Sequence, residues 1–127
     1  MELNEFKAKK YENIISSMVD YMNYDDEDEE EDFDCGYTQA DIDECCRILD
    51  NYIDELIALS SNPSAGKIME SVRNVVLALN KLTENSPLIE TDQREYLVPF
   101  IIEAAKTAGL EVKTLPDDDI TYEWREW

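Results

Sequence analysis

This chain of 127 residues is short enough to form one domain, and its apolar content of 43% is typical of a globular protein. Its 31 acidic and 11 basic residues give a formal net charge of −20. Such an acidic surface disfavours nucleic acid and anionic membranes and favours a basic protein partner. Histidine is absent, which removes Ser-His-Asp catalysis, Cys-His catalysis and nearly every catalytic zinc site. We therefore expect a protein that is not an enzyme and needs no cofactor.

The cysteines and the first residues of the chain bear on its location. Cys45 and Cys46 are neighbours on an expected helix, where a disulfide between them would be strained. We expect unpaired thiols in the core and a reducing compartment. The first residues lack the apolar stretch of a signal peptide, and the longest apolar stretch, residues 97–102, is too short to cross a membrane. The sequence therefore predicts a cytoplasmic location.

The first two segments with helical spacing of apolar residues lie on either side of an acidic stretch. The first covers residues 3–24. The second begins at Thr38, where Asp41 is placed to complete a capping pair, and ends near Ser60. The residues expected to face inward are Phe6, Tyr11, Ile14, Ile15, Met18, Val19 and Met22 in the first segment, and Ile42, Cys45, Leu49, Tyr52, Ile53 and Leu56 in the second.

Two further helices are expected in the second half of the chain. Asn62 before Pro63 indicates an N-cap, and this helix should end near Asn85. The last helix should run from a cap at Thr91 to Ala108, with Gly109 terminating it. Pro99 lies inside it, so we expect a kink or a free carbonyl at residue 95. The expected inward faces are Ile68 or Met69, Val72, Val75, Val76, Leu79 and Leu82, then Leu97, Ile101, Ala104, Ala105 and Ala108.

The C-terminal residues are harder to assign. Residues 110–115 could form a short extended segment, followed by a turn at 116–119. Residues 120–127 fit strand alternation or a helical face, and we favour a short helix because Asp119 or Thr121 could cap it. Trp124 and Trp127 are common interface residue types, but we expect them to close the core.

Four helices joined by short connections predict an all-α bundle. We expect one domain, residues 1–127, with an acidic loop at 25–37 between the first two helices and a short C-terminal segment.

Between residues 25 and 34 the chain holds nine carboxylates and one aromatic, Phe33. A helix here would place like charges four residues apart, so we expect an extended segment. Three interpretations are open: a solvated linker, a mimic of a nucleic-acid strand and a docking surface for a basic protein. The candidate partner-binding residues are Asp25, Asp26, Glu27, Asp28, Glu29, Glu30, Glu31, Asp32 and Asp34, with Asp117, Asp118 and Asp119 as a second patch.

The mimic and a calcium site each match the sequence only in part. An extended run has one charge per roughly 3.7 Å, near the phosphate spacing of about 3.4 Å along one strand, but a second row is missing. For an EF-hand, placing Gly36 at position 6 of the loop puts Phe33, Cys35 and Ile42 at positions that need oxygen ligands. The EF-hand pattern therefore fails, and only loose binding of divalent cations stays open as a calcium-related function.

Two segments suggest a family. They are Leu88-Ile-Glu-Thr-Asp-Gln-Arg-Glu-Tyr-Leu-Val-Pro-Phe-Ile-Ile-Glu-Ala-Ala-Lys-Thr-Ala-Gly and Asp119-Ile-Thr-Tyr-Glu-Trp-Arg-Glu-Trp. Together they resemble the C-terminal half of small cytosolic immunity proteins encoded beside bacterial polymorphic and contact-dependent growth-inhibition toxins. The resemblance implies an α-helical protein that binds the toxin domain of its own system, often a basic RNase or DNase, and blocks its cleft or active site.

The leading hypothesis is therefore an acidic, non-enzymatic inhibitor of the immunity-protein class, with a basic toxin domain, expected to be a nuclease, as its partner. The acidic run would steer the toxin and form part of the contact. The alternatives are a nucleic-acid mimic that inhibits a DNA-binding enzyme and, less favoured, a calcium-binding protein.

Overall fold

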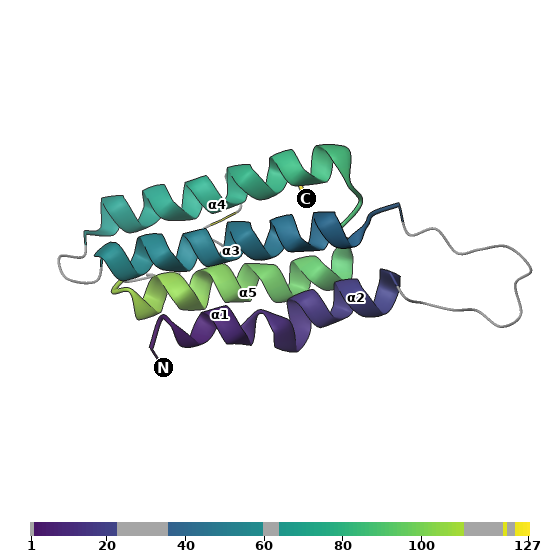
Figure 1. The fold of residues 1–127 in the computed structure, drawn as a ribbon. Helices are drawn as coiled ribbons and strands as arrows, with labels where there is room; N and C mark the ends of the chain where they lie inside the picture. The colour runs from purple at the N-terminus through teal and green to yellow at the C-terminus, as the bar shows by residue number, and fades with distance from the viewer. Residues whose placement is uncertain (1, 23–35, 60–63, 111–120, 122–123) are drawn as a thin grey trace, which may run out of the picture.

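The chain folds as a bundle of four helical rods, which confirms the predicted all-α architecture (Figure 1). In this computed structural model the described residues are 2–22, 36–59, 64–110, 121 and 124–127, and none of them belongs to a strand. The first rod has three parts, and each other rod is one helix. The bounds are α1 Glu5–Lys9, a π-helical turn Tyr11–Ile15 and α2 Ser16–Met22 in the first rod, then α3 Gln39–Leu59, α4 Ala65–Asn85 and α5 Thr91–Thr107.

Successive rods run in opposite directions. α3 and α4 lie side by side, α5 packs against both, and the first rod packs against α3 and α5 (Figure 1). One end of the bundle therefore gathers the ends of α2 and α4 and the starts of α3 and α5. We call it the loop end, because residues 23–35 join α2 to α3 there, and we call the other half of the bundle the far half.

The core is formed by the apolar faces that the periodicity predicted. Every residue expected to face inward on α3 and α5 is buried, and α4 buries its stripe from Ile68 to Leu79 with Leu82 half-buried beside it. Each large aliphatic side chain removed from water contributes roughly 1.5–3 kcal/mol. The Tyr52 hydroxyl donates to the Ile101 carbonyl oxygen at 2.7 Å and links α3 to α5. Burial raises the pKa of this phenol.

The first rod differs from the prediction in its middle. The Ile15 amide donates to the Lys10 carbonyl at 2.9 Å, five residues earlier, which is the pattern of a π-helical turn. Tyr11 is consequently 53% exposed, whereas Lys10 is 2% exposed. The inward placement of Tyr11 was wrong, because the rod is not one regular α-helix. The other predicted core residues of the rod are buried or half-buried: Phe6, Ile14, Ile15, Met18, Val19 and Met22.

Lys10 is accepted in the core because polar groups surround its ammonium. Nζ lies 2.8 Å from Asp50 Oδ1 on α3, donates to the Lys7 carbonyl and lies 4.1 Å from the centre of the Tyr11 ring. Lys7 forms an ion pair with Asp54, and the hydrogen bond from that pair raises the pKa of Lys7. Ion pairs therefore join the first rod to α3 in addition to apolar contacts.

The start of α3 follows the prediction, and the start of α4 does not. The Thr38 amide donates to Asp41 Oδ2 at 3.0 Å, which confirms this capping pair. α4 begins two residues later than predicted, because the Ser64 hydroxyl accepts the Lys67 amide at 3.3 Å. The expected cap at Asn62 was therefore wrong, and Asn62 itself lies outside the described residues.

α5 begins and ends with specific backbone contacts. Its N-cap is Glu90, whose amide donates to Gln93 Oε1 at 3.1 Å, so Thr91 is the first helical residue and not the predicted cap. Gly109 terminates the helix as predicted, with φ of 117°. The Leu110 amide then donates to the Ala105 carbonyl at 3.0 Å, which closes a Schellman motif.

Pro99 lies in the interior of α5, as expected, and the helix continues through it. Proline has no amide hydrogen, so the Glu95 carbonyl lacks the helical donor four residues ahead. Pro99 and Glu95 are both exposed, so this missing hydrogen bond lies on the outer face of α5.

The described residues of the C-terminal segment, 121 and 124–127, are bound to α4. The amides of Trp124 and Arg125 both donate to the Thr121 carbonyl, and residues 125–127 have no regular structure. The buried Asn80 side chain donates to the Trp124 carbonyl at 2.7 Å and accepts the Glu126 amide at 3.0 Å. The short helix predicted over residues 120–127 is therefore not formed at 125–127, while residues 120, 122 and 123 lie outside the described residues.

Trp124 and Trp127 are half-buried and pack against the core, as predicted. Most of the expected extended segment and turn, residues 111–119, lies outside the described part of the chain. Within the described residues, no helix has both the length and the apolar content needed to cross a membrane.

Candidate partner-binding surface

The loop end is the candidate surface, because both attachment points of the acidic run are there. Met22 closes α2, and Gly36 is the first described residue after the run. The predicted partner-binding residues, Asp25 to Asp34 and Asp117 to Asp119, lie outside the described residues. The structure therefore describes the base on which the run is mounted, and this base was not predicted.

Tyr37 ties the two attachment points together. It is 6% exposed, and its hydroxyl donates to the Met18 carbonyl of α2 at 2.9 Å. Its ring stacks on that of Tyr21, with centres 6.2 Å apart and planes at 24°. The chain entering the run and the chain leaving it are thus held against each other by an aromatic pair and a buried hydrogen bond.

Gly36 is needed at this position for two reasons. Its φ of 86° lies in the left-handed region, where other residues are strained. A Cβ atom added here would also lie 2.8 Å from Pro87 Cγ, in the connection between α4 and α5. The run therefore leaves its base through a turn that also packs against a third part of the chain.

Gln93 connects α5 to the same base. The side chain is 7% exposed, and Nε2 donates to Ser17 Oγ on α2 at 3.3 Å. A hollow of about 220 Å³ opens beside these contacts at the start of α5. It is lined by Tyr21, Tyr37, Pro87, Leu88, Glu90, Thr91, Asp92 and Gln93.

The exposed carboxylates at the loop end form no ion pair with a described base. Asp20, Glu90 and Asp92 all belong to this group. In the far half, by contrast, Lys7 and Lys10 join the first rod to α3 by ion pairs, although other exposed carboxylates there, such as Glu2 and Glu55, form none with a described base. The pairs among the described residues are Lys7 with Asp54, Lys10 with Asp50 and Lys106 with Glu103 in the far half, and Arg47 with Glu44 along α3.

The concentration of carboxylates makes the loop end a candidate surface for a cation. Asp20, Glu90 and Asp92 are exposed there, and the sequence adds nine more carboxylates between residues 25 and 34. A basic partner that replaces released counterions would be attracted to such a surface over a distance of about 10 Å at moderate salt.

The cysteines offer no reactive centre in the described structure. Burial raises the pKa of the Cys45 thiol to about 12, which keeps it protonated at neutral pH. Cys46 is half-buried, and burial raises its pKa as well. Both packing positions match the predicted core role, while Cys35 lies outside the described residues. No group of histidine, cysteine or carboxylate side chains suited to a metal ion occurs in the part of the chain that is described.

Sequence reasoning missed Tyr37 and Gln93, the two residues that build the base of the run. An aromatic residue directly after Gly36 was the available signal for the first, since a buried aromatic often anchors the exit of a turn. Gln93 carried no comparable signal, because its partner Ser17 is 76 residues away in the sequence.

Comparison with protein-family models, with curated proteins and with solved structures found no match.

Proposed function

We propose that this chain is a non-enzymatic acidic inhibitor of the immunity-protein class, which binds and neutralises a basic toxin domain with nuclease activity. The observation that carries the proposal is the group of exposed carboxylates at the loop end, Asp20, Glu90 and Asp92, at the point where the acidic run is attached. Nucleases that bind the phosphate backbone present basic clefts, and a surface of this charge is complementary to them.

The base of the run supports this role because it is rigid. Buried contacts of Tyr37 with Met18 and of Gln93 with Ser17 fix both ends of the run on the bundle. A fixed base limits the conformations that a bound segment must give up, which reduces the entropy cost of binding. The family comparisons add nothing for or against the immunity class, so the proposal rests on charge and on this base.

The test uses the toxin domain encoded by the neighbouring open reading frame. We expect stoichiometric inhibition of its nuclease activity by the purified chain and formation of a stable complex in size-exclusion chromatography. Unrelated DNA-binding enzymes should be unaffected. Full nuclease activity in the presence of excess chain would overturn the proposal.

The same assay separates the two alternatives. A nucleic-acid mimic would inhibit several unrelated DNA-binding enzymes to a similar extent, because it would present phosphate-like charge and no specific contact. A calcium-binding protein would show a melting temperature that rises with calcium and not with magnesium, since only bound ligand stabilises the folded state.

A further inference from the structure

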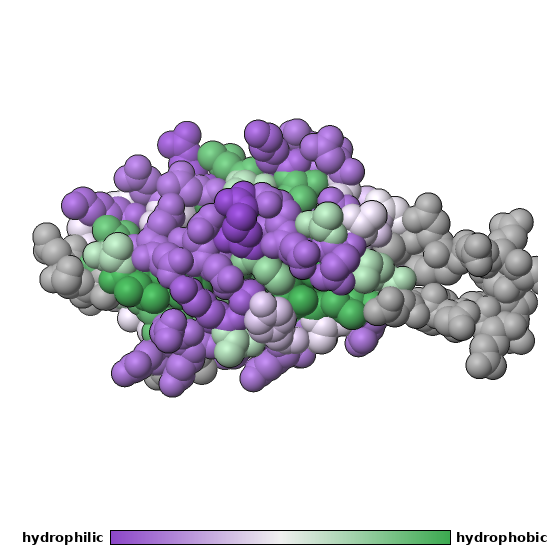
Figure 2. All heavy atoms as spheres, in the orientation of Figure 1, coloured by the Kyte–Doolittle hydropathy of each residue, from purple (hydrophilic) through white to green (hydrophobic). Residues whose placement is uncertain are grey.

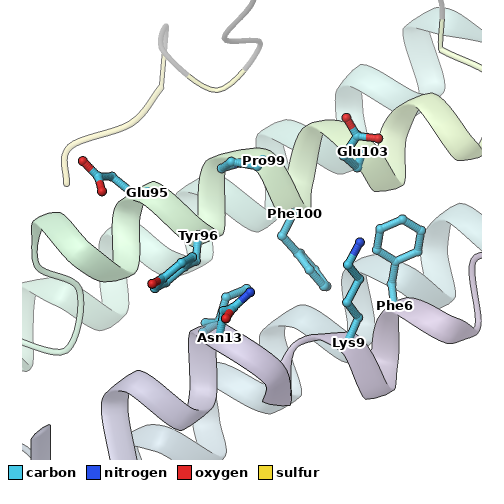
Figure 3. Close-up of a pocket in the computed structure, with 9 residues that line it drawn as sticks. Phe6, Lys9, Asn13, Glu95, Tyr96, Pro99, Phe100 and Glu103 are labelled. Carbon is cyan, nitrogen blue, oxygen red and sulfur yellow. The ribbon is translucent and has the colours of Figure 1, made fainter. Parts of the chain in front are cut away.

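A second hollow lies between the first rod and α5, away from the Tyr37 base. Its volume is about 150 Å³, and its floor is mainly aromatic (Figure 3). Phe6 and Phe100 meet edge to face with ring centres 5.6 Å apart, and the exposed Tyr96 continues this aromatic surface. We call this hollow the aromatic groove.

Both walls of the groove carry an irregular helical turn. Asn13 and Ile14 enter it from the π-helical turn, and such turns often occur at functional sites. On the other wall Pro99 leaves the Glu95 carbonyl without its helical donor. The groove thus has a wall in which one helical hydrogen bond is missing.

The α5 rim is acidic. Glu95, Pro99 and Glu103 follow one another at four-residue intervals, so they form one row along the helix. The two carboxylates are about 12 Å apart along the axis at 1.5 Å per residue. In Figure 3 both carboxylates project from the side of α5 that faces away from the Phe100 ring, so they would have to turn inward to reach a ligand in the groove.

Lys9 indicates that the aromatic groove can hold a cationic side chain. Its neighbours Lys7 and Lys10 form ion pairs with α3, whereas Lys9 forms none with a described residue. Its ammonium lies instead 5.6 Å from the centre of the Phe6 ring and points from α1 toward the groove (Figure 3). The aromatic floor therefore already holds a cation, supplied by an exposed side chain that can move.

We infer that the aromatic groove is an anchoring site for an arginine side chain of the basic partner, which displaces Lys9. A guanidinium stacks on aromatic rings more favourably than an ammonium, and its donors can pair with one of the two rim carboxylates, Glu95 or Glu103, at a time. This inference rests on the proposed basic partner, but it concerns a different surface from the acidic run.

The test uses a short acetylated and amidated peptide with one arginine, followed by NMR titration of the full-length protein. We expect saturable shifts of the Phe6, Tyr96 and Phe100 ring signals. The same peptide with citrulline in place of arginine should not produce them, because citrulline has no charge. Shifts confined to the Tyr21 and Tyr37 rings, or equal shifts with both peptides, would overturn the inference.

The variants Lys9→Gln and Lys67→Gln separate the local effect from net charge. Both remove one positive charge, but Lys67 is exposed at the start of α4 and does not line the groove. Since an exposed cation–π contact is worth about 0.5–1 kcal/mol, Lys9→Gln should tighten peptide binding about two- to fivefold beyond the effect of Lys67→Gln. Equal affinities of the two variants would contradict displacement of Lys9.

The double variant Glu95→Gln/Glu103→Gln should weaken the same shifts. If the groove signals instead change with protein concentration before any peptide is added, a second copy of the chain is the occupant and the inference fails. Peptide binding at the groove without nuclease inhibition would refute the proposed function alone, and nuclease inhibition without groove shifts would refute this inference alone.

Discussion

The loop end and the far half of this bundle use their charged residues differently. In the far half, Lys7 and Lys10 pair with Asp54 and Asp50, and Lys10 is buried by doing so. At the loop end the contacts that hold the rods together are uncharged: Tyr37 with Met18 and Gln93 with Ser17.

We interpret this difference as a division of roles: charged residues of the far half stabilise the fold, and carboxylates of the loop end are available to a partner. Ion pairs of the far half contribute to the native state, so their removal should lower stability. The exposed carboxylates Asp20, Glu90 and Asp92 at the loop end form no ion pair between described rods, and Glu90 contributes to folding as the N-cap of α5. Figure 2 shows that hydrophilic side chains cover most of the face turned to the viewer, with hydrophobic side chains exposed between them. The loop end and the far half are therefore distinguished by the sign of their charges and by the ion pairs between rods, and not by polarity alone.

The largest stability loss should come from Asp50→Asn. This change leaves the Lys10 ammonium buried without its anionic partner. Because the Asp50 side chain is 38% exposed, we expect a loss below the full cost of a broken buried pair, about 2–3 kcal/mol. Urea unfolding followed by circular dichroism measures it. The control Lys10→Met/Asp50→Asn removes both charges and should lose less stability than Asp50→Asn alone, because no buried charge is then left without a partner.

Alkaline pH should destabilise the core shared by the two regions. Burial raises the folded-state pKa of Cys45 from 9.0 to about 12, so the folded state favours the protonated thiol. Its contribution is complete below pH 9 and is lost as the pH rises toward 12. Between pH 8 and 10.5 we expect a loss of about 2 kcal/mol from this group. Urea unfolding at pH 8 and at pH 10.5 measures this loss. In Cys45→Val the free energy of unfolding should fall by about 2 kcal/mol less between the two pH values than in the unmodified chain. An equal fall in both proteins would refute the assignment to Cys45.

Tyr37→Phe should loosen the loop end without affecting the far half. The variant keeps the ring stack with Tyr21 and removes only the hydrogen bond to the Met18 carbonyl. The expected cost is about 1 kcal/mol. Hydrogen exchange should accelerate in the last turn of α2 and stay unchanged around Lys10. Equal acceleration in both places would show that the two regions are not independent.

The smallest stability effect should come from the acidic run itself. Six substitutions to the matching amides, at residues 27–32, remove like charges that repel one another. We expect the free energy of unfolding to stay the same or to rise by up to about 1 kcal/mol. A clear loss of stability would show that the run is part of the folded structure's ion-pair network.

The sequence was sufficient for the parts of the fold that depend on local patterning. The inward faces of α3, α4 and α5, the Thr38 and Asp41 pair and the Gly109 terminus follow from spacing and backbone preferences that a few neighbouring residues determine. The same holds for the half-buried tryptophans of the C-terminal segment.

The remaining features depend on contacts between distant residues. Lys10 is buried beside Asp50, forty positions later, with which it pairs, and the π-helical turn starts directly after it. The described end of the chain is held by Asn80, which binds the backbone of Trp124 and Glu126. At the candidate surface, the sequence was sufficient to identify the acidic run. It did not predict the contacts on which the run is mounted, since the contact of Gln93 with Ser17 leaves no local pattern.

The central claim is that the loop end, where the acidic run is attached, attracts a basic toxin through its carboxylates. Two variants of equal net charge test it by stopped-flow association with the neighbouring toxin domain at several salt concentrations. One carries five amides at residues 27–31. The other carries five amides at exposed positions away from the loop end, which are Glu2, Glu5, Glu12, Glu55 and Glu70.

We expect the first variant to associate about tenfold or more slowly at low salt and to lose most of its salt dependence, since steering depends on the local field. The second variant should associate nearly as fast as the unmodified chain. Equal rates for the two variants would contradict the claim, because net charge alone, and not the loop end, would then govern the encounter.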